Sequence, residues 1–194
     1  YTITTPAGLD LLAKKVNAGT DYYDTYFKLG ADITYTHKAD GEEGADTENN
    51  YTAIGNNYRP FCGHFDGKGY TISGIRIYKG GTDYSTDGYQ GLFGSIGNSS
   101  AEVKNITLTD TRITAAGHIG GIAGFNSAST IENCHVTNTV TIQSNGNSEI
   151  YLGGIAGELH DYNGVDPCVR GCTSAATVSG NSEVGGIVGK LYDG

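Results

Sequence analysis

The fold is decided by the four-residue motif Gly121-Ile122-Ala123-Gly124, because close copies of it recur along the chain. We call this motif the glycine word. The copies are Gly91-Leu92-Phe93-Gly94, Gly154-Ile155-Ala156-Gly157 and Gly186-Ile187-Val188-Gly189. The first glycines of successive words lie 30, 33 and 32 residues apart. A nearly fixed period of this length is typical of proteins that stack one structural repeat on the next.

Short apolar segments keep a steady offset from the glycine word. Pairs of apolar residues three positions apart occur at Ile72 and Ile75, Val103 and Ile106, Ile131 and Cys134, and Val169 and Cys172. The segments are rich in Val, Ile and Thr and are separated by Gly, Asn, Ser and Asp, which indicates strands joined by turns. We therefore expect an all-β, right-handed parallel β-helix, or β-solenoid, with about three short strands per coil of roughly 30 residues.

Two other folds fit the sequence less well than the solenoid does. A helical repeat needs longer apolar runs with a period of 3.6 and few glycines. An antiparallel sandwich also has short strands, but it would not repeat one word in one register. In a parallel stack, equivalent residues of successive coils lie about 4.8 Å apart. The period therefore predicts two inward columns, formed by Ile75, Ile106, Cys134 and Cys172, and by Leu92, Ile122, Ile155 and Ile187.

The first 20 residues depart from the repeat. Thr5 and Pro6 precede apolar residues with helical spacing, and Gly19 follows them, so the pattern predicts an amphipathic helix. We expect Leu9, Leu12, Ala13 and Val16 to cover the open end of the first coil. A helix that binds a partner or a membrane surface is the alternative, although its polar face is not basic.

The composition favours one domain over residues 1–194, with a helix region at 1–20, first coils at 21–90 and glycine-word repeats at 91–194. The chain has 37% hydrophobic residues, 31 glycines, a formal net charge of −9 and a pI near 4.8. This charge argues against nucleic acid and against an anionic membrane as partners. No run of about 20 apolar residues and no signal peptide occur. Because methionine is absent and the last word ends the chain, we expect a fragment of a longer protein.

A longer motif precedes the glycine words. Residues 61–74 read Phe-Cys-Gly-His-Phe-Asp-Gly-Lys-Gly-Tyr-Thr-Ile-Ser-Gly, and Asn105-Ile106 and Asn133-Cys134 follow glycine words. Together these features resemble the GLUG-motif repeat proteins of bacterial cell surfaces, over about residues 50–194. The resemblance implies a β-solenoid surface protein, sometimes attached to a peptidase or other modules. It brings no shared catalytic residues, so none are assigned.

The residues themselves favour a protein that is not an enzyme and that needs no cofactor. Polysaccharide hydrolysis requires paired carboxylates, and Asp66 stands in a tight glycine turn where it is expected to bond backbone N–H groups. The histidines and arginines are scattered and form no metal or nucleophile motif. We expect Cys134 and Cys172 to be reduced core residues, while Cys62 and Cys168 are either free or paired.

A dense run of carboxylates lies between the first strands. It comprises Asp40, Glu42, Glu43, Asp46 and Glu48. Such oxygens could bind Ca²⁺, but their spacing matches neither an EF-hand nor a calcium β-roll. We interpret the run as a solvated loop, with a metal site as the alternative.

Binding residues are expected where the coils carry extra residues, at Tyr78–Gln90 and Gln143–Tyr151. Insertions at one point of successive coils project from one flank. The candidates are Tyr78, Tyr84, Tyr89, Asn145, Asn147 and Tyr151, because hydroxyl-tipped rings suit both sugars and proteins.

The sequence thus favours a non-catalytic module of a bacterial surface, extracellular or attached to the cell. It would act as a spacer or an adhesin toward a glycan or protein on a host or neighbouring cell, without membrane insertion. The alternatives are a polysaccharide-active β-helix enzyme and an accessory repeat of a surface peptidase.

Overall fold

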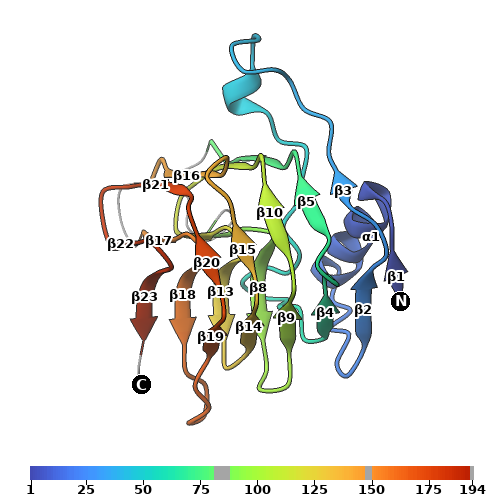
Figure 1. Cartoon of the computed structure of the whole chain (residues 1–194). Helices are drawn as coiled ribbons and strands as arrows, with labels where there is room; N and C mark the ends of the chain where they lie inside the picture. The colour runs from blue at the N-terminus through green and yellow to red at the C-terminus, as the bar shows by residue number, and fades with distance from the viewer. Residues whose placement is uncertain (81–87, 147–149, 193–194) are drawn as a thin grey trace.

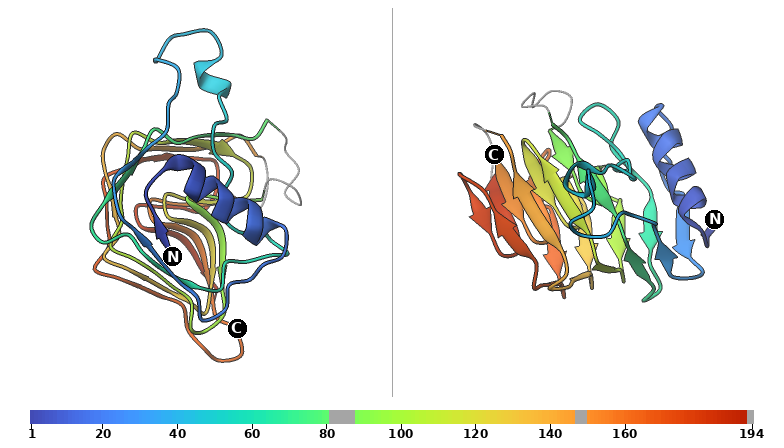
Figure 2. Two further views of the ribbon diagram at one scale, coloured as in Figure 1. Left: turned by 90° about the vertical axis from the view of Figure 1, so that its right-hand side faces the viewer. Right: turned by 90° about the horizontal axis from the view of Figure 1, so that it is seen from above.

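The computed structural model describes residues 1–80, 88–146 and 150–192. Its strands form parallel sheets that wrap around one apolar core, and the chain advances by one coil at each turn (Figures 1 and 2). An α-helix covers the N-terminal end of the stack. The predicted parallel β-solenoid with an N-terminal helix is confirmed.

Five sheets occur in the described residues, and we number them in the order in which the chain visits them. The first contains β1 (Thr2–Ile3), β2 (Tyr26–Leu29), β4 (His64–Asp66), β9 (Glu102–Lys104), β14 (Thr130–Glu132) and β19 (Cys168–Arg170). The second contains β3 (Ile33–Thr34), β5 (Thr71–Ser73), β10 (Thr107–Thr109), β15 (His135–Val136) and β20 (Thr173–Ser174). The third contains β6 (Arg76–Tyr78), β11 (Arg112–Ala115), β16 (Thr141–Ser144) and β21 (Thr177–Ser179).

The last two sheets flank the glycine words. The fourth sheet contains β7 (Tyr89–Gln90), β12 (His118–Gly120), β17 (Tyr151–Gly153) and β22 (Val184–Gly185). The fifth contains β8 (Phe93–Gly97), β13 (Ala123–Ser127), β18 (Ala156–His160) and β23 (Val188–Tyr192). A full coil therefore has five short strands, and the expectation of about three was wrong.

The two additional strands lie on either side of the corner that each glycine word forms. Gly121 and Ile122 form the corner between β12 and β13, and Ala123 and Gly124 begin β13, so each word joins two strands. A methyl group on Gly120 would lie 2.6 Å from the carbonyl oxygen of Ile155 and would overlap that of Ala123. Glycine is required there because the backbones approach too closely for any side chain.

The predicted columns point into the core. Ile75, Ile106 and Cys134 are at most 1% exposed, and Leu92, Ile122 and Ile155 are equally buried. Cys172 and Ile187 continue the two columns but are partly exposed, because they belong to the last described coil. All four cysteines are free, and a hydrogen bond between the Cys134 and Cys172 thiols lowers the pKa of Cys172 to about 7.

The cap helix α1 (Pro6–Asn17) has the predicted boundaries and buried face. The hydroxyl of Thr5 accepts a hydrogen bond from the backbone N–H of Gly8, and Pro6 occupies the first turn. The four residues assigned to the plug are all buried: Leu9, Leu12, Ala13 and Val16. They remove the apolar end of the first coil from water.

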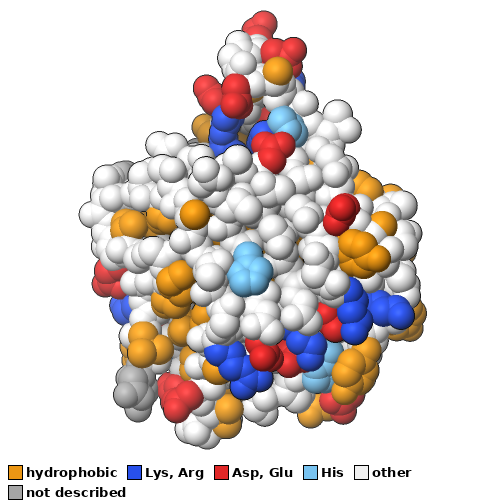
Figure 3. Space-filling view, in the orientation of Figure 1, with side chains coloured by type: hydrophobic (Ala, Val, Ile, Leu, Met, Phe, Trp, Pro, Cys, Tyr) orange, Lys and Arg blue, Asp and Glu red, His pale blue; other side chains and the backbone are white. Residues whose placement is uncertain are grey.

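The outer face of the first sheet carries alternating charges in a single column. Parallel register places Lys28, Asp66, Lys104, Glu132 and Arg170 next to one another on successive strands. Figure 3 shows the resulting band of basic and acidic side chains low on this face. Opposite charges on neighbouring strands neutralise each other, so this band presents no single-sign surface.

The acidic run lies on a loop that projects from the stack at the top of Figure 1 and includes the short 3₁₀ helix η1 (Ala45–Thr47). At the base of the loop, the carboxylate of Asp110 lies 2.9 Å from both Arg76 and His37. Burial raises the pKa of Asp110, but the hydrogen bonds from Arg76 and His37 outweigh burial and lower it. The ionised carboxylate thus holds the loop base against the third coil.

Replacing Asp110 with asparagine should destabilise the protein more at neutral pH than in acid. A carboxyl group whose pKa is lowered by folding contributes stability above its unfolded pKa of about 3.9, and loses it as the pH falls through the folded value. Asparagine tolerates the positive φ of 42° at this position, so the change mainly removes charge. Urea unfolding of both proteins at pH 7 and pH 3 tests this, and a difference independent of pH would contradict it.

Candidate functional site: an aromatic groove beside the glycine words

The outward side chains of the fourth and fifth sheets line a groove of about 310 Å³. We name it the aromatic groove, and it is defined by Tyr89, His118, Phe125, Tyr151, Glu158, His160, Lys190 and Tyr192. These residues come from four successive coils, so the groove runs along the axis of the solenoid.

Parallel register explains why these residues meet. His118 on β12 is paired with Tyr89 on β7 and with Tyr151 on β17, which gives one column. Two further columns lie on the fifth sheet: Phe125, Glu158 and Lys190, and then Ser127, His160 and Tyr192. Because strands alternate their side chains between faces, residues one and three positions after each glycine word point to the same side.

The rings of the groove hold one another in fixed orientations. The rings of Tyr89 and Phe125 are nearly parallel, with centroids 4.9 Å apart and an interplanar angle of 7°. His160 and Tyr192 stack in the same way at 4.6 Å and 7°. Such pairing contributes about 0.5–1.5 kcal/mol beyond area burial, so the aromatic surface is preorganised.

Three polar groups accompany the rings: the His118 imidazole, the Glu158 carboxylate and the Lys190 ammonium. Nδ1 of His118 lies 2.8 Å from a carboxylate oxygen of Glu158, and these residues are only 3% and 5% exposed. The ammonium group of Lys190 donates a hydrogen bond to the Tyr151 hydroxyl at 2.9 Å and lies 4.2 Å from that ring's centroid. This hydrogen bond raises the pKa of Lys190, so the groove keeps a cation at neutral pH.

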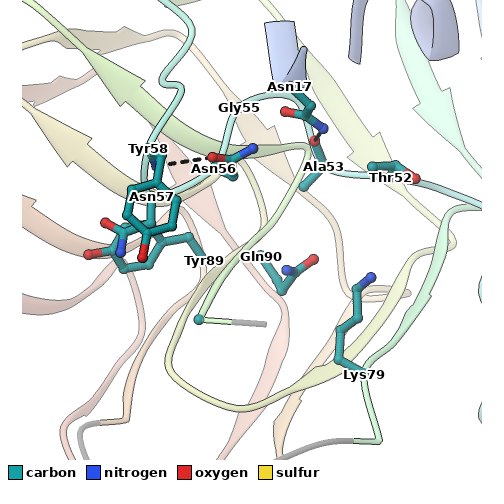
Figure 4. A pocket seen from close by; sticks show the side chains of 11 residues that line it. Asn17, Thr52, Ala53, Gly55, Asn56, Asn57, Tyr58, Lys79, Tyr89 and Gln90 are labelled. Carbon is teal, nitrogen blue, oxygen red and sulfur yellow. Dashed lines mark hydrogen bonds between the residues drawn. The ribbon is translucent and has the colours of Figure 1, made fainter. Parts of the chain in front are cut away.

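A second cavity of about 370 Å³ adjoins the groove at its N-terminal end. We name it the amide pocket, and Figure 4 shows its lining from the end of α1, from residues 52–58 between η1 and β4, and from Lys79 and residues 88–90. Asn17, Asn56, Asn57, Tyr58, Lys79 and Tyr89 are among the labelled residues. Asn56 is held in place because its side-chain oxygen accepts hydrogen bonds from the backbone of Tyr58 and Arg59. Tyr89 lines both cavities.

The structure brings together only part of the predicted binding flank. Tyr89 and Tyr151 lie in the aromatic groove, on either side of His118. Tyr78 lies at the end of β6 in the third sheet, and Asn145 donates a hydrogen bond to the carbonyl oxygen of Lys79 at 2.7 Å. Neither lines the groove. Tyr84 and Asn147 fall outside the described residues.

Sequence reasoning missed most of the groove. The missed residues are His118, Phe125, Glu158, His160, Lys190 and Tyr192. A signal for them did exist, because Phe125, Glu158 and Lys190 each directly follow a glycine word. Comparing residues at fixed offsets after each word would have identified this column.

Within the described residues, four of the five carboxylates of the acidic loop have protein partners, namely those of Asp40, Glu42, Asp46 and Glu48. Arg112 binds Asp40 at 2.7 Å and Asp46 at 3.0 Å. Glu42 and Glu48 accept hydrogen bonds from the backbone N–H groups of Ala39 and Lys38, while the carbonyl of Glu43 accepts one from the Lys38 ammonium. Across the part of the chain that the structure describes, no three His, Cys, Asp or Glu side chains are grouped so as to hold a metal ion.

Comparisons with known proteins support the sequence-based resemblance. A family model described as "The GLUG motif" matches residues 115–141, from the end of β11 to the start of β16. The chain is 30% identical to halomucin of Haloquadratum walsbyi over 98% of its length, and 36% identical over 65% of its length to a putative Gly-rich membrane protein of Evansella cellulosilytica. It spans only 2% and 13% of the lengths of these relatives. No solved structure matches the chain.

The described residues contain no helix long and apolar enough to cross a membrane. The motif match covers almost one whole coil, including the glycine word at Gly121–Gly124. The expected resemblance to GLUG-motif surface repeat proteins is therefore confirmed.

Proposed function

Because this chain carries the GLUG motif and repeats its glycine word through a β-solenoid, we propose that it is a non-catalytic surface module that binds a glycan along the aromatic groove. The observation that carries the proposal is the set of preorganised rings beside His118, Glu158 and Lys190. It acts outside the cell or at the cell surface, toward a host or neighbouring cell.

Glycan chemistry fits the groove better than other ligand chemistry does. A pyranose ring has apolar C–H faces that pack on aromatic rings, and hydroxyl groups that need a few fixed polar partners. The groove follows the solenoid axis, along which coils repeat about every 4.8 Å, so its side chains are evenly spaced along an extended chain of sugars. The net charge of −9 disfavours nucleic acid as the polymer.

Binding is favoured over hydrolysis by the number of carboxylates. Glycosidases that use two Asp or Glu residues place them on either side of the scissile bond. Among the described residues that line the groove, Glu158 supplies the single carboxylate, and Nδ1 of His118 lies 2.8 Å from one of its oxygens. These groups suit the orientation of a ligand's hydroxyl groups.

Replacing Phe125 or Tyr192 with alanine should weaken glycan binding at least about tenfold, because each change removes one ring of the stacked surface. The measurement is isothermal titration against a panel of soluble neutral and acidic polysaccharides. Tyr70→Ala is the matched control, since Tyr70 is 36% exposed and does not line the groove. Its affinity should equal that of the unchanged protein.

Two outcomes contradict the proposed function. One is that no polysaccharide in the panel binds the unchanged protein. The other is that the two groove variants, with unaltered circular dichroism, bind as tightly as the Tyr70→Ala control. Release of new reducing ends or of unsaturated sugars during the titration would overturn the non-catalytic assignment alone.

A further inference from the structure

The amide pocket and the aromatic groove share a wall. Tyr89 lines both cavities, and its ring stacks on Phe125 in the groove at 4.9 Å. In Figure 4, Tyr58 and Tyr89 stand on one side of the pocket and Lys79 stands on the other. The two cavities therefore meet at Tyr89.

The pocket differs from the groove in its charge. Its polar lining is made of amides and hydroxyls, including Asn17, Thr52, Asn56 and Asn57, and Lys79 is the single charged residue among the described residues that line it. Within the described part of the chain, Lys79 forms no ion pair with a carboxylate. A protein with a net charge of −9 thus presents an isolated cation inside a concave site.

The pocket is built from parts that are fixed independently. Asn17, at the end of α1, donates a hydrogen bond from its side chain to the carbonyl of Ala53 at 3.0 Å. The backbone of Lys79 is held by hydrogen bonds to Thr114 and Asn145. The cap helix therefore contributes one wall of the pocket in addition to covering the core.

We propose that the amide pocket takes one sugar residue bearing an anionic group, a carboxylate or a sulfate, that faces Lys79, while its neighbours in the same chain occupy the aromatic groove. The proposal rests on the proposed function and names its ligand class. Tyr58 and Tyr89 offer rings to the sugar, the amides bond its hydroxyls, and the ammonium group of Lys79 pairs with the anion.

The test compares three oligosaccharides of equal length: one containing uronic acids, one sulfated and one neutral. We expect the unchanged protein to bind one of the anionic oligosaccharides about tenfold more tightly than the neutral one, and Lys79→Gln to remove this preference. Lys79→Arg should retain it. Lys15→Gln, an exposed residue that does not line the pocket, controls for the same change of net charge. Preference for the uronic or the sulfated ligand identifies the anion.

The outcomes separate this inference from the proposed function. If Lys79→Gln keeps the preference while Phe125→Ala loses binding, the inference is overturned and the groove remains the binding site. Equal affinity for anionic and neutral oligosaccharides overturns it as well. If none of the three ligands binds and Phe125→Ala is also without effect in the polysaccharide panel, both proposals fail.

Discussion

Replacing Gly121 with alanine is expected to lower the free energy of unfolding by about 3 kcal/mol, since the added methyl group has no room. It would lie 2.6 Å from the backbone carbonyl oxygen of Gly154 in the next coil and 3.0 Å from a methyl carbon of Val136. A backbone atom cannot move aside without shifting the whole coil. For a chain of this size, the change corresponds to a melting temperature lower by about 6 to 12 °C.

Gly186→Ala is the matched control for this substitution. Gly186 is the first glycine of its word, like Gly121, but an added methyl group there meets nothing within 4 Å. Its φ lies outside the left-handed region, so alanine imposes no backbone strain. Thermal and urea unfolding should show a change within about 0.5 kcal/mol. Equal destabilisation by the two variants would mean that glycine is needed for a reason other than coil packing.

Truncation of Leu9 to alanine should lower the free energy of unfolding by about 2 to 5 kcal/mol, the usual range when a buried leucine is removed from a core. Leu9 is fully buried in α1, where it closes the end of the first coil. Without this side chain, the helix loses packing area and leaves a cavity over the apolar core. Urea unfolding followed by circular dichroism provides the measurement.

Leu11→Ala tests whether the effect belongs to the buried face. Leu11 lies on the same helix but is 56% exposed, so its truncation should change stability by no more than about 0.5 kcal/mol. A small effect of Leu9→Ala, similar to that of Leu11→Ala, would show that the helix does not act as a plug. Because α1 supplies Asn17 to the amide pocket, loosening the helix should also weaken binding there.

Much of the fold could be predicted from residue spacing alone. The period of the glycine words gave the parallel stack, and the apolar pairs gave the inward columns, because a parallel coil places equivalent residues directly over one another. The helix was recognisable from Thr5, Pro6 and the spacing of Leu9, Leu12 and Val16. The residues that predict the helix are close together in the sequence, and those that predict the stack recur at a fixed period.

The strand count and most of the groove could not be predicted in the same way. The apolar pattern predicts whether a side chain points inward or outward, but it does not predict the angle at which the fourth and fifth sheets meet. That angle brings His118 of one coil against Glu158 of the next, and Tyr89 against Phe125. The lining of the amide pocket was still harder to predict from the sequence, because Asn17, Asn56 and Lys79 lie in segments that do not follow the repeat.

The sequence by itself determined the repeat, its register and the capping of its first coil, since these depend on contacts between equivalent residues at a fixed period. Tertiary structure alone decided that each glycine word joins two strands, that the fourth and fifth sheets form an aromatic groove, and that Lys79 lines the amide pocket beside it. The physical reason is that outward side chains are not constrained by the core. Their convergence depends on how tightly the glycine backbones pack, which only the folded chain defines.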